Sequence, residues 1–146
     1  MTQPIHILNG PNLNLLGTRE PEIYGALTLG EIEQACSAHA HNLGFDIVFR
    51  QSNHEGELLD WLHDANVNAS AVVFNPAAFT HTSVALHDAV RAIEPPVIEV
   101  HLSQTAARES FRHHSYIALA ARGSITGLGL QSYLLGINAA VTCLRN

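Results

Sequence analysis

The sequence predicts an α/β fold with a five-stranded parallel sheet, and three observations support this prediction. Short apolar runs of strand length alternate along the chain with segments of helical periodicity, which is typical of repeated β–α–β units. The run at 71–74 contains only apolar residues, as expected for a strand buried on both faces of a parallel sheet. A length of 146 residues suits one domain with its own core, so we expect a single domain over 1–146.

The first predicted strand, at 4–8, is followed by a long loop and then by a helix. Thr28 and Glu31 have the Thr-x-x-Glu spacing of a capping box, which marks a helix start. Apolar residues then recur at helical spacing until Gly44, a typical helix stop. The second strand is predicted directly afterwards, at 45–50.

The middle of the chain repeats this order. Ser52 and Glu55 again have capping-box spacing and predict the start of the second helix. The apolar strand at 71–74 leads through a short loop to a third helix, predicted over about 83–93.

The last third of the chain contains a fourth predicted strand at 97–100 and two short candidates for further strands, at 117–119 and 124–126. A stripe of apolar residues at 3.6-residue spacing predicts a final helix over 130–144. Because β–α–β crossovers are right-handed, these elements predict a flavodoxin-like, doubly wound sheet in a three-layer αβα arrangement.

Composition limits the possible partners. The formal net charge is −6 and the chain has only 7 Lys+Arg residues, which argues against nucleic acid or an anionic membrane surface as a partner. No apolar run approaches the roughly 18 residues of a membrane span, and no signal peptide is visible. Cys36 and Cys143 form no CxxC pair, so we expect free thiols in a reducing cytoplasm.

Polar residues are predicted to gather at one edge of the sheet. Asn9 follows the first strand, Asn75 follows the third, and Glu99 and His101 close the fourth. Alternation along a strand places Glu99 and His101 on the same side. Ligands bind outside the carboxyl ends of the strands in such sheets, so this edge is the expected site.

The loop at 9–25 is unusually long, since two to six residues commonly join a strand to its helix. It carries Arg19 and Tyr24 between Gly17 and Gly25, which are placed to act as hinges of a lid. An arginine near a tyrosine favours the phenolate. Spacing alone nevertheless favours a solvated Arg19 and a half-buried Tyr24.

The loop at 75–83 ends at Thr82 and Ser83, either of which can cap the third helix. A helix N-terminus near the strand ends suits an anion such as a carboxylate, and a plain capped helix is an equal interpretation.

Three other functions have weaker support. The 10 histidines lack metal-ligand spacing, and Gly127-Leu128-Gly129 is a lone GxG, a weak indication of a flavin- or nucleotide-binding module. No G-x-S-x-G elbow is present. The chain contains no lysine, which excludes an imine to a lysine side chain.

Several segments together resemble the type II 3-dehydroquinate dehydratases. They are NGPNLNLLGTREPEIYG at 9–25 and the segments 75–83, 97–103, 108–115 and 127–133. The resemblance implies anti elimination of water from 3-dehydroquinate to give 3-dehydroshikimate through an enolate, without metal, Schiff base or cofactor. It also implies a cytoplasmic homododecamer, a tetramer of trimers, in aromatic amino acid biosynthesis or in quinate breakdown.

The resemblance assigns roles to individual residues. Tyr24 matches the base, and Arg19 matches the residue that lowers the pKa of that tyrosine. Asn12 matches the residue that stabilises the enolate oxygen. His101 matches the acid that protonates the leaving hydroxyl, and Glu99 matches the carboxylate that orients His101. The positions that match substrate-binding residues are Asn75, His81, Leu102, Ser103 and Arg112, together with Asp88, which matches a residue that reaches a neighbouring subunit's site. Gln104 and Ala106 depart from the common pattern, which has Asn and His there.

Overall fold

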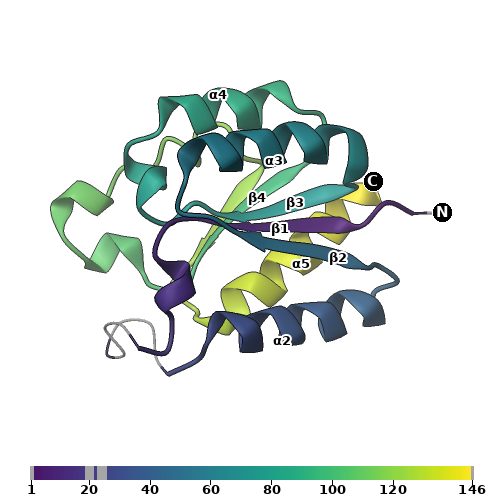
Figure 1. The fold of residues 1–146 in the computed structure, drawn as a ribbon, viewed down its shortest axis with the longest axis horizontal. Helices are drawn as coiled ribbons and strands as arrows, with labels where there is room; N and C mark the ends of the chain where they lie inside the picture. Colours follow the sequence, from purple (N-terminus) through teal and green to yellow (C-terminus); the bar gives the residue numbers. More distant parts are fainter. Residues whose placement is uncertain (1, 19–21, 23–25, 146) are drawn as a thin grey trace.

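The computed structural model describes residues 2–18, 22 and 26–145 and contains a five-stranded, all-parallel sheet. The strands are β1 (Ile5–Asn9), β2 (Ile47–Gln51), β3 (Ala71–Asn75), β4 (Val97–His101) and β5 (Gly123–Thr126). Their order across the sheet is β2-β1-β3-β4-β5, which is the flavodoxin-like order. The predicted fold class is therefore confirmed (Figure 1).

The four α-helices of the described chain cover the two faces of the sheet. They are α2 (Leu29–Asn42), α3 (Glu55–Asn68), α4 (Val84–Ala92) and α5 (Leu130–Leu144). α2 and α5 lie against one face, and α3 and α4 lie against the other (Figure 1). None of the helices in this part of the chain is long and apolar enough to cross a membrane.

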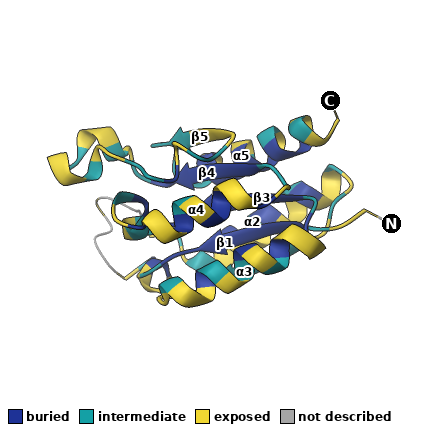
Figure 2. Ribbon diagram, turned by 90° about the horizontal axis from the view of Figure 1, so that it is seen from above, coloured by how far each residue is buried: buried dark blue, intermediate teal, exposed yellow. Residues whose placement is uncertain are grey.

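Side-chain alternation along the strands supplies both cores. Ile7 and Val73 point toward α2 and α5, whereas Leu8 and Phe74 point toward α3 and α4. Every residue of β1, β3 and β4 is buried, because these strands lie inside the sheet and are covered on both faces (Figure 2). The edge strands β2 and β5 are only partly buried.

The capping-box prediction is confirmed at the first helix. The Thr28 hydroxyl accepts a hydrogen bond from the backbone amide of Glu31, and the Glu31 carboxylate accepts one from the amide of Thr28. Ser83 also caps α4 as predicted, because its hydroxyl accepts from the amide of Leu86.

The second capping-box prediction is wrong. The residue before α3 is His54, which makes no side-chain cap, and Glu55 is the first residue of the helix itself. The Ser52 hydroxyl instead accepts from the amide of His54, a local turn that competes with helix capping.

The strand candidate at 117–119 is also wrong, and the candidate at 124–126 belongs to β5. Ile117 starts a turn in which its carbonyl accepts from the amides of Ala120 and Ala121. Its side chain is fully buried in the core beneath α3 and α4. An apolar residue placed for packing thus produced the strand-like pattern.

His6 is a buried titratable side chain in β1. Its side chain is buried, and Nδ1 has no hydrogen-bond partner among the described residues. Burial lowers the pKa of His6 from 6.5, and the nearby Arg50 cation lowers it further, against the opposing effects of Asp64 and the Asn68 carbonyl. The unfolded chain therefore takes up a proton at a pH where the folded chain does not.

We expect the free energy of unfolding to fall as the pH drops below about 6.5, and His6→Leu to reduce this loss. Uptake of this one proton changes the free energy of unfolding by at most about 1.4 kcal/mol per pH unit. Urea unfolding from pH 7.5 to pH 5 measures it, with His63→Gln on the exposed face of α3 as the control. Parallel stability curves for wild type and His6→Leu would contradict the assignment.

Candidate active site

A cavity of about 190 Å³ opens at the carboxyl ends of the strands, the edge at which the sequence predicts a site. Its lining comes from the last residues of β3 and β4 and from the segments that follow β1, β3 and β4: Pro11, Asn12, Leu13, Leu15, Leu16, Asn75, Ala77, Ala78, His81, His101, Leu102, Ser103, Thr105, Arg108 and Arg112. This size suits a small molecule rather than a polymer.

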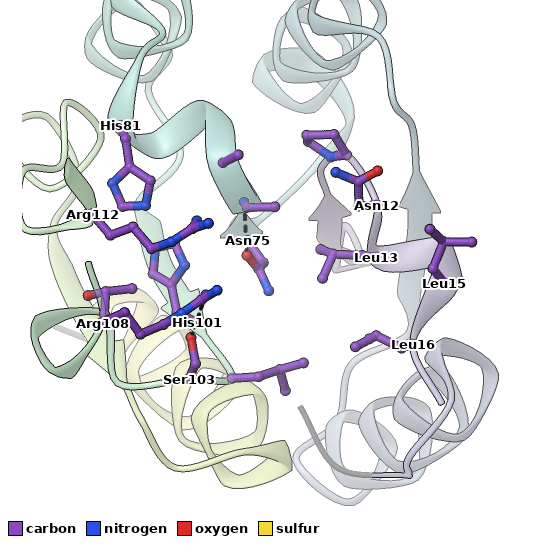
Figure 3. A pocket seen from close by; sticks show the side chains of 15 residues that line it. Asn12, Leu13, Leu15, Leu16, Asn75, His81, His101, Ser103, Arg108 and Arg112 are labelled. Atoms are coloured by element: carbon purple, nitrogen blue, oxygen red, sulfur yellow. Dashed lines mark hydrogen bonds between the residues drawn. The ribbon is translucent and has the colours of Figure 1, made fainter. Parts of the chain in front are cut away.

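The two sides of the cavity differ in chemistry. Figure 3 shows the leucines of the first loop on one side and His81, Arg108 and Arg112 on the other, with Asn75 between them. A ligand held here meets apolar surface on one side and hydrogen-bond donors and positive charge on the other.

Glu99 and His101 form a buried pair. Both lie on β4 two residues apart, and His101 Nε2 is 2.7 Å from Glu99 Oε2. The prediction that the two residues point to the same side is therefore confirmed. His101 lines the cavity, whereas Glu99 lies behind it and is 1% exposed.

Three hydroxyl groups surround the Glu99 carboxylate. Thr80 and Ser115 donate hydrogen bonds to Oε2, and Ser124 donates to Oε1 over 2.9 Å. Burial alone would raise the pKa of Glu99, but the hydrogen bond and charge of His101 and the hydrogen bonds from Thr80 and Ser115 lower it to about 2. Glu99 is therefore ionised at neutral pH and directs one nitrogen of His101 toward itself.

A chain of buried hydrogen bonds runs behind Asn75 and joins β1, β3 and α5. The Tyr133 hydroxyl donates to Asn9 Oδ1 over 2.6 Å and accepts from Asn75 Nδ2 over 2.9 Å. At the two ends, Asn9 Nδ2 donates to the carbonyl of Arg50, and the amide of Ala77 donates to Asn75 Oδ1. Burial raises the pKa of Tyr133, so its phenol remains protonated.

His81 and two arginines form the polar side of the cavity. His81 Nδ1 donates to the carbonyl of His114 over 2.8 Å. Burial is the main cause that lowers the pKa of His81 from 6.5, so the ring is neutral at pH 7, and with Nδ1 as the donor its acceptor nitrogen is Nε2. Arg112 Nε donates to Glu109 over 3.0 Å, and Arg108 Nε lies 3.8 Å from the same oxygen.

The first loop is attached to the neighbouring strand ends. Asn12 has a left-handed backbone with φ 70°, and its backbone N–H donates to Asn53 Oδ1 over 2.9 Å. Gly10 donates its amide to the carbonyl of Asn75, and a Cβ at Gly10 would lie 2.3 Å from the carbonyl oxygen of Pro76. Only glycine permits this approach of the first and third loops.

The structure brings most of the predicted site residues together. Those that line the cavity are Asn12, Asn75, His81, His101, Leu102, Ser103 and Arg112. Asp88 is exposed on α4 and does not line this cavity. Arg19 and Tyr24 lie outside the described residues.

Sequence reasoning did not select Arg108 or the hydroxyls of Thr80, Ser115 and Ser124 as site residues. The three hydroxyls come from separate segments with no common spacing. Only the contact of Ser124 with Glu99 has a possible sequence signal, because these two residues are partners in the register of β4 and β5. That signal can be used only when the pairing of the two strands is already known.

The anion site at the N-terminus of α4 stays a prediction. The cavity is lined by Ala77, Ala78 and His81, which precede the helix, and the Ser83 hydroxyl occupies the amide of Leu86. The Ser83 cap is common to both interpretations of this helix start. Among the described residues, no three His, Cys, Asp or Glu side chains are grouped so that they could hold a metal ion.

Comparison with known proteins agrees with this geometry. Residues 3–141 match the family model described as dehydroquinase class II. The chain is 88% identical over 146 residues to the 3-dehydroquinate dehydratase of Maricaulis maris, with all of both chains covered. It is 57% identical over 145 residues to that of Caulobacter vibrioides, with 99% of each covered.

A solved structure is similar throughout the fold. The type II dehydroquinase from Propionibacterium acnes superposes with a TM-score of 0.91 at 41% identity, over 100% of this chain and 99% of that one. Family model, relatives and fold agree over nearly the whole length, and the chain therefore belongs to the class II dehydroquinase family.

Proposed function

We propose that the chain converts 3-dehydroquinate to 3-dehydroshikimate by anti elimination of water through an enolate, as a step of the shikimate pathway. Family membership supports the reaction. The observation that carries the proposal in the structure is the Glu99–His101 pair at the edge of a cavity sized for a small molecule.

The reaction needs a base for the proton next to the ketone, a donor for the enolate oxygen and an acid for the leaving hydroxyl. We assign the base to Tyr24, assisted by Arg19, and the enolate donor to Asn12. His101 gives the proton that converts the departing hydroxyl to water. Its Nε2–H donates to the ionised Glu99, so His101 acts as the acid in its doubly protonated form, gives the proton from the other ring nitrogen, Nδ1, and is left as the neutral imidazole.

The polar side of the cavity suits the rest of the substrate. Arg112 and Ser103 provide donors for a carboxylate, and the neutral Nε2 of His81 accepts from a hydroxyl. Asn75 and Leu102 complete the binding surface. No step of this scheme requires a cofactor, because the substrate's own ketone stabilises the enolate.

We also propose a cytoplasmic homododecamer, arranged as a tetramer of trimers, in which Asp88 contributes to a neighbouring subunit's site. Phe111, Leu119 and Leu128 are each more than half exposed, and such apolar side chains suit subunit contacts. Sedimentation velocity tests the assembly, and a monomer or dimer at micromolar concentration would contradict it.

Ultraviolet absorbance after addition of 3-dehydroquinate tests the reaction. The conjugated enone of the product absorbs where the substrate does not, so we expect absorbance to rise, with the same rate in excess chelator. A flat signal from folded protein would contradict the proposal and favour a binding module. Loss of the signal with chelator alone would show that a metal takes part.

A further inference from the structure

We propose that Tyr133 is a positioning residue that fixes the side-chain amide of Asn75, so that Asn75 presents an N–H and not an oxygen to the substrate. The inference rests on the proposed function and deepens it. Tyr133 itself is fully buried on α5 and does not line the cavity, so it acts only through Asn75.

The two ends of the buried hydrogen-bond chain have fixed polarity because both are backbone groups. The carbonyl of Arg50 can only accept, so Asn9 turns Nδ2 toward it and Oδ1 toward Tyr133. The amide of Ala77 can only donate, so Asn75 turns Oδ1 toward it and Nδ2 toward Tyr133.

The polarity of the middle follows from these ends. The single hydroxyl proton of Tyr133 goes to Asn9 Oδ1, which leaves a lone pair to accept from Asn75 Nδ2. One hydrogen of Asn75 Nδ2 is thereby used, and the second is left for the cavity that Asn75 lines. A flipped amide would set Asn75 Nδ2 against the amide of Ala77, two donors facing each other.

The backbone at Ala77 is consistent with a position held for function. Ala77 has φ 53°, a left-handed conformation that is unfavourable for a residue with a Cβ. Its amide donates to Asn75 Oδ1 from this conformation. The resulting donor-only edge of Asn75 selects an acceptor on the bound molecule, such as a carbonyl, carboxylate or hydroxyl oxygen.

A double-mutant cycle on kcat/KM tests the inference, using wild type, Asn75→Ala, Tyr133→Phe and the double variant. We expect Tyr133→Phe to lower kcat/KM roughly tenfold in the wild-type background and less than about twofold in the Asn75→Ala background. Thr142→Val, which removes an exposed hydroxyl near the end of α5, is the control and should leave kcat/KM unchanged.

A purely structural role for Tyr133 predicts equal losses in both backgrounds, and that result would overturn the inference. If Tyr133→Phe does not fold, Asn9→Ala replaces it in the cycle. This variant takes away the acceptor of the Tyr133 proton, so Asn9 no longer holds that proton away from Asn75 and the orientation of the Asn75 amide is less firmly fixed. The same Asn75-dependent loss is expected. Wild type without turnover would overturn the proposed function and this inference together, whereas additive losses in an active enzyme would overturn the inference alone.

Discussion

Replacement of His101 by alanine is expected to lower kcat roughly 10²–10⁴-fold, the usual contribution of a general acid. The structure supplies the reason. His101 lines the cavity, and its Nε2 is held 2.7 Å from a carboxylate that stays ionised. Loss of the imidazole leaves the hydroxyl to depart without a proton, while the base that forms the enolate is untouched.

Deuterium exchange separates this acid role from a general loss of structure. In deuterated water, His101→Ala should still exchange the proton next to the ketone, so recovered 3-dehydroquinate should gain deuterium although little product forms. Steady-state kinetics and mass spectrometry of recovered substrate measure the two steps. If His101→Ala keeps most of its kcat, another group is the acid. If it loses deuterium exchange as well, His101 takes part in forming the enolate and not only in the later loss of the hydroxyl.

Glu99→Gln is the matched variant for the orienting carboxylate. It keeps the size of the side chain and one oxygen acceptor, but removes the negative charge that the hydroxyls of Thr80, Ser115 and Ser124 surround. Its effect on kcat should be smaller than that of His101→Ala and should nearly vanish in the His101→Ala background, because in the proposed mechanism Glu99 acts through His101.

The layered fold was predictable because its information is local. The buried strands are short, mainly apolar runs, and helix faces repeat every 3.6 residues, so each central strand was located within one residue of its observed bounds. The errors occur where one local signal has two structural meanings. Ser52 binds a turn amide instead of capping a helix, and Ile117 is apolar for packing instead of pairing in a sheet.

The candidate site was predictable where residues follow strand ends. Asn75 and His101 lie at such ends, and parallel strands bring those ends to one edge. The groups behind them were not predictable, because their contacts cross the sheet. Ser124 meets Glu99 through strand register, and Tyr133 meets Asn75 across 58 positions of sequence. No periodicity encodes a contact of that kind.

Tyr24→Phe is expected to lower kcat and kcat/KM together by roughly 10²–10⁴-fold and, unlike His101→Ala, to abolish deuterium exchange. In the proposed mechanism, removal of the phenol hydroxyl takes away the group that accepts the proton, so no enolate forms. The sequence contains only three tyrosines, so Tyr→Phe variants at the other two positions complete the comparison with Tyr24→Phe. Tyr133→Phe should keep exchange with a roughly tenfold loss of kcat/KM, and Tyr116→Phe, which alters a half-buried ring against His114, should change little. Continued exchange in folded Tyr24→Phe would remove this residue from the base role, and the base would then have to be sought among the groups on the polar side of the cavity.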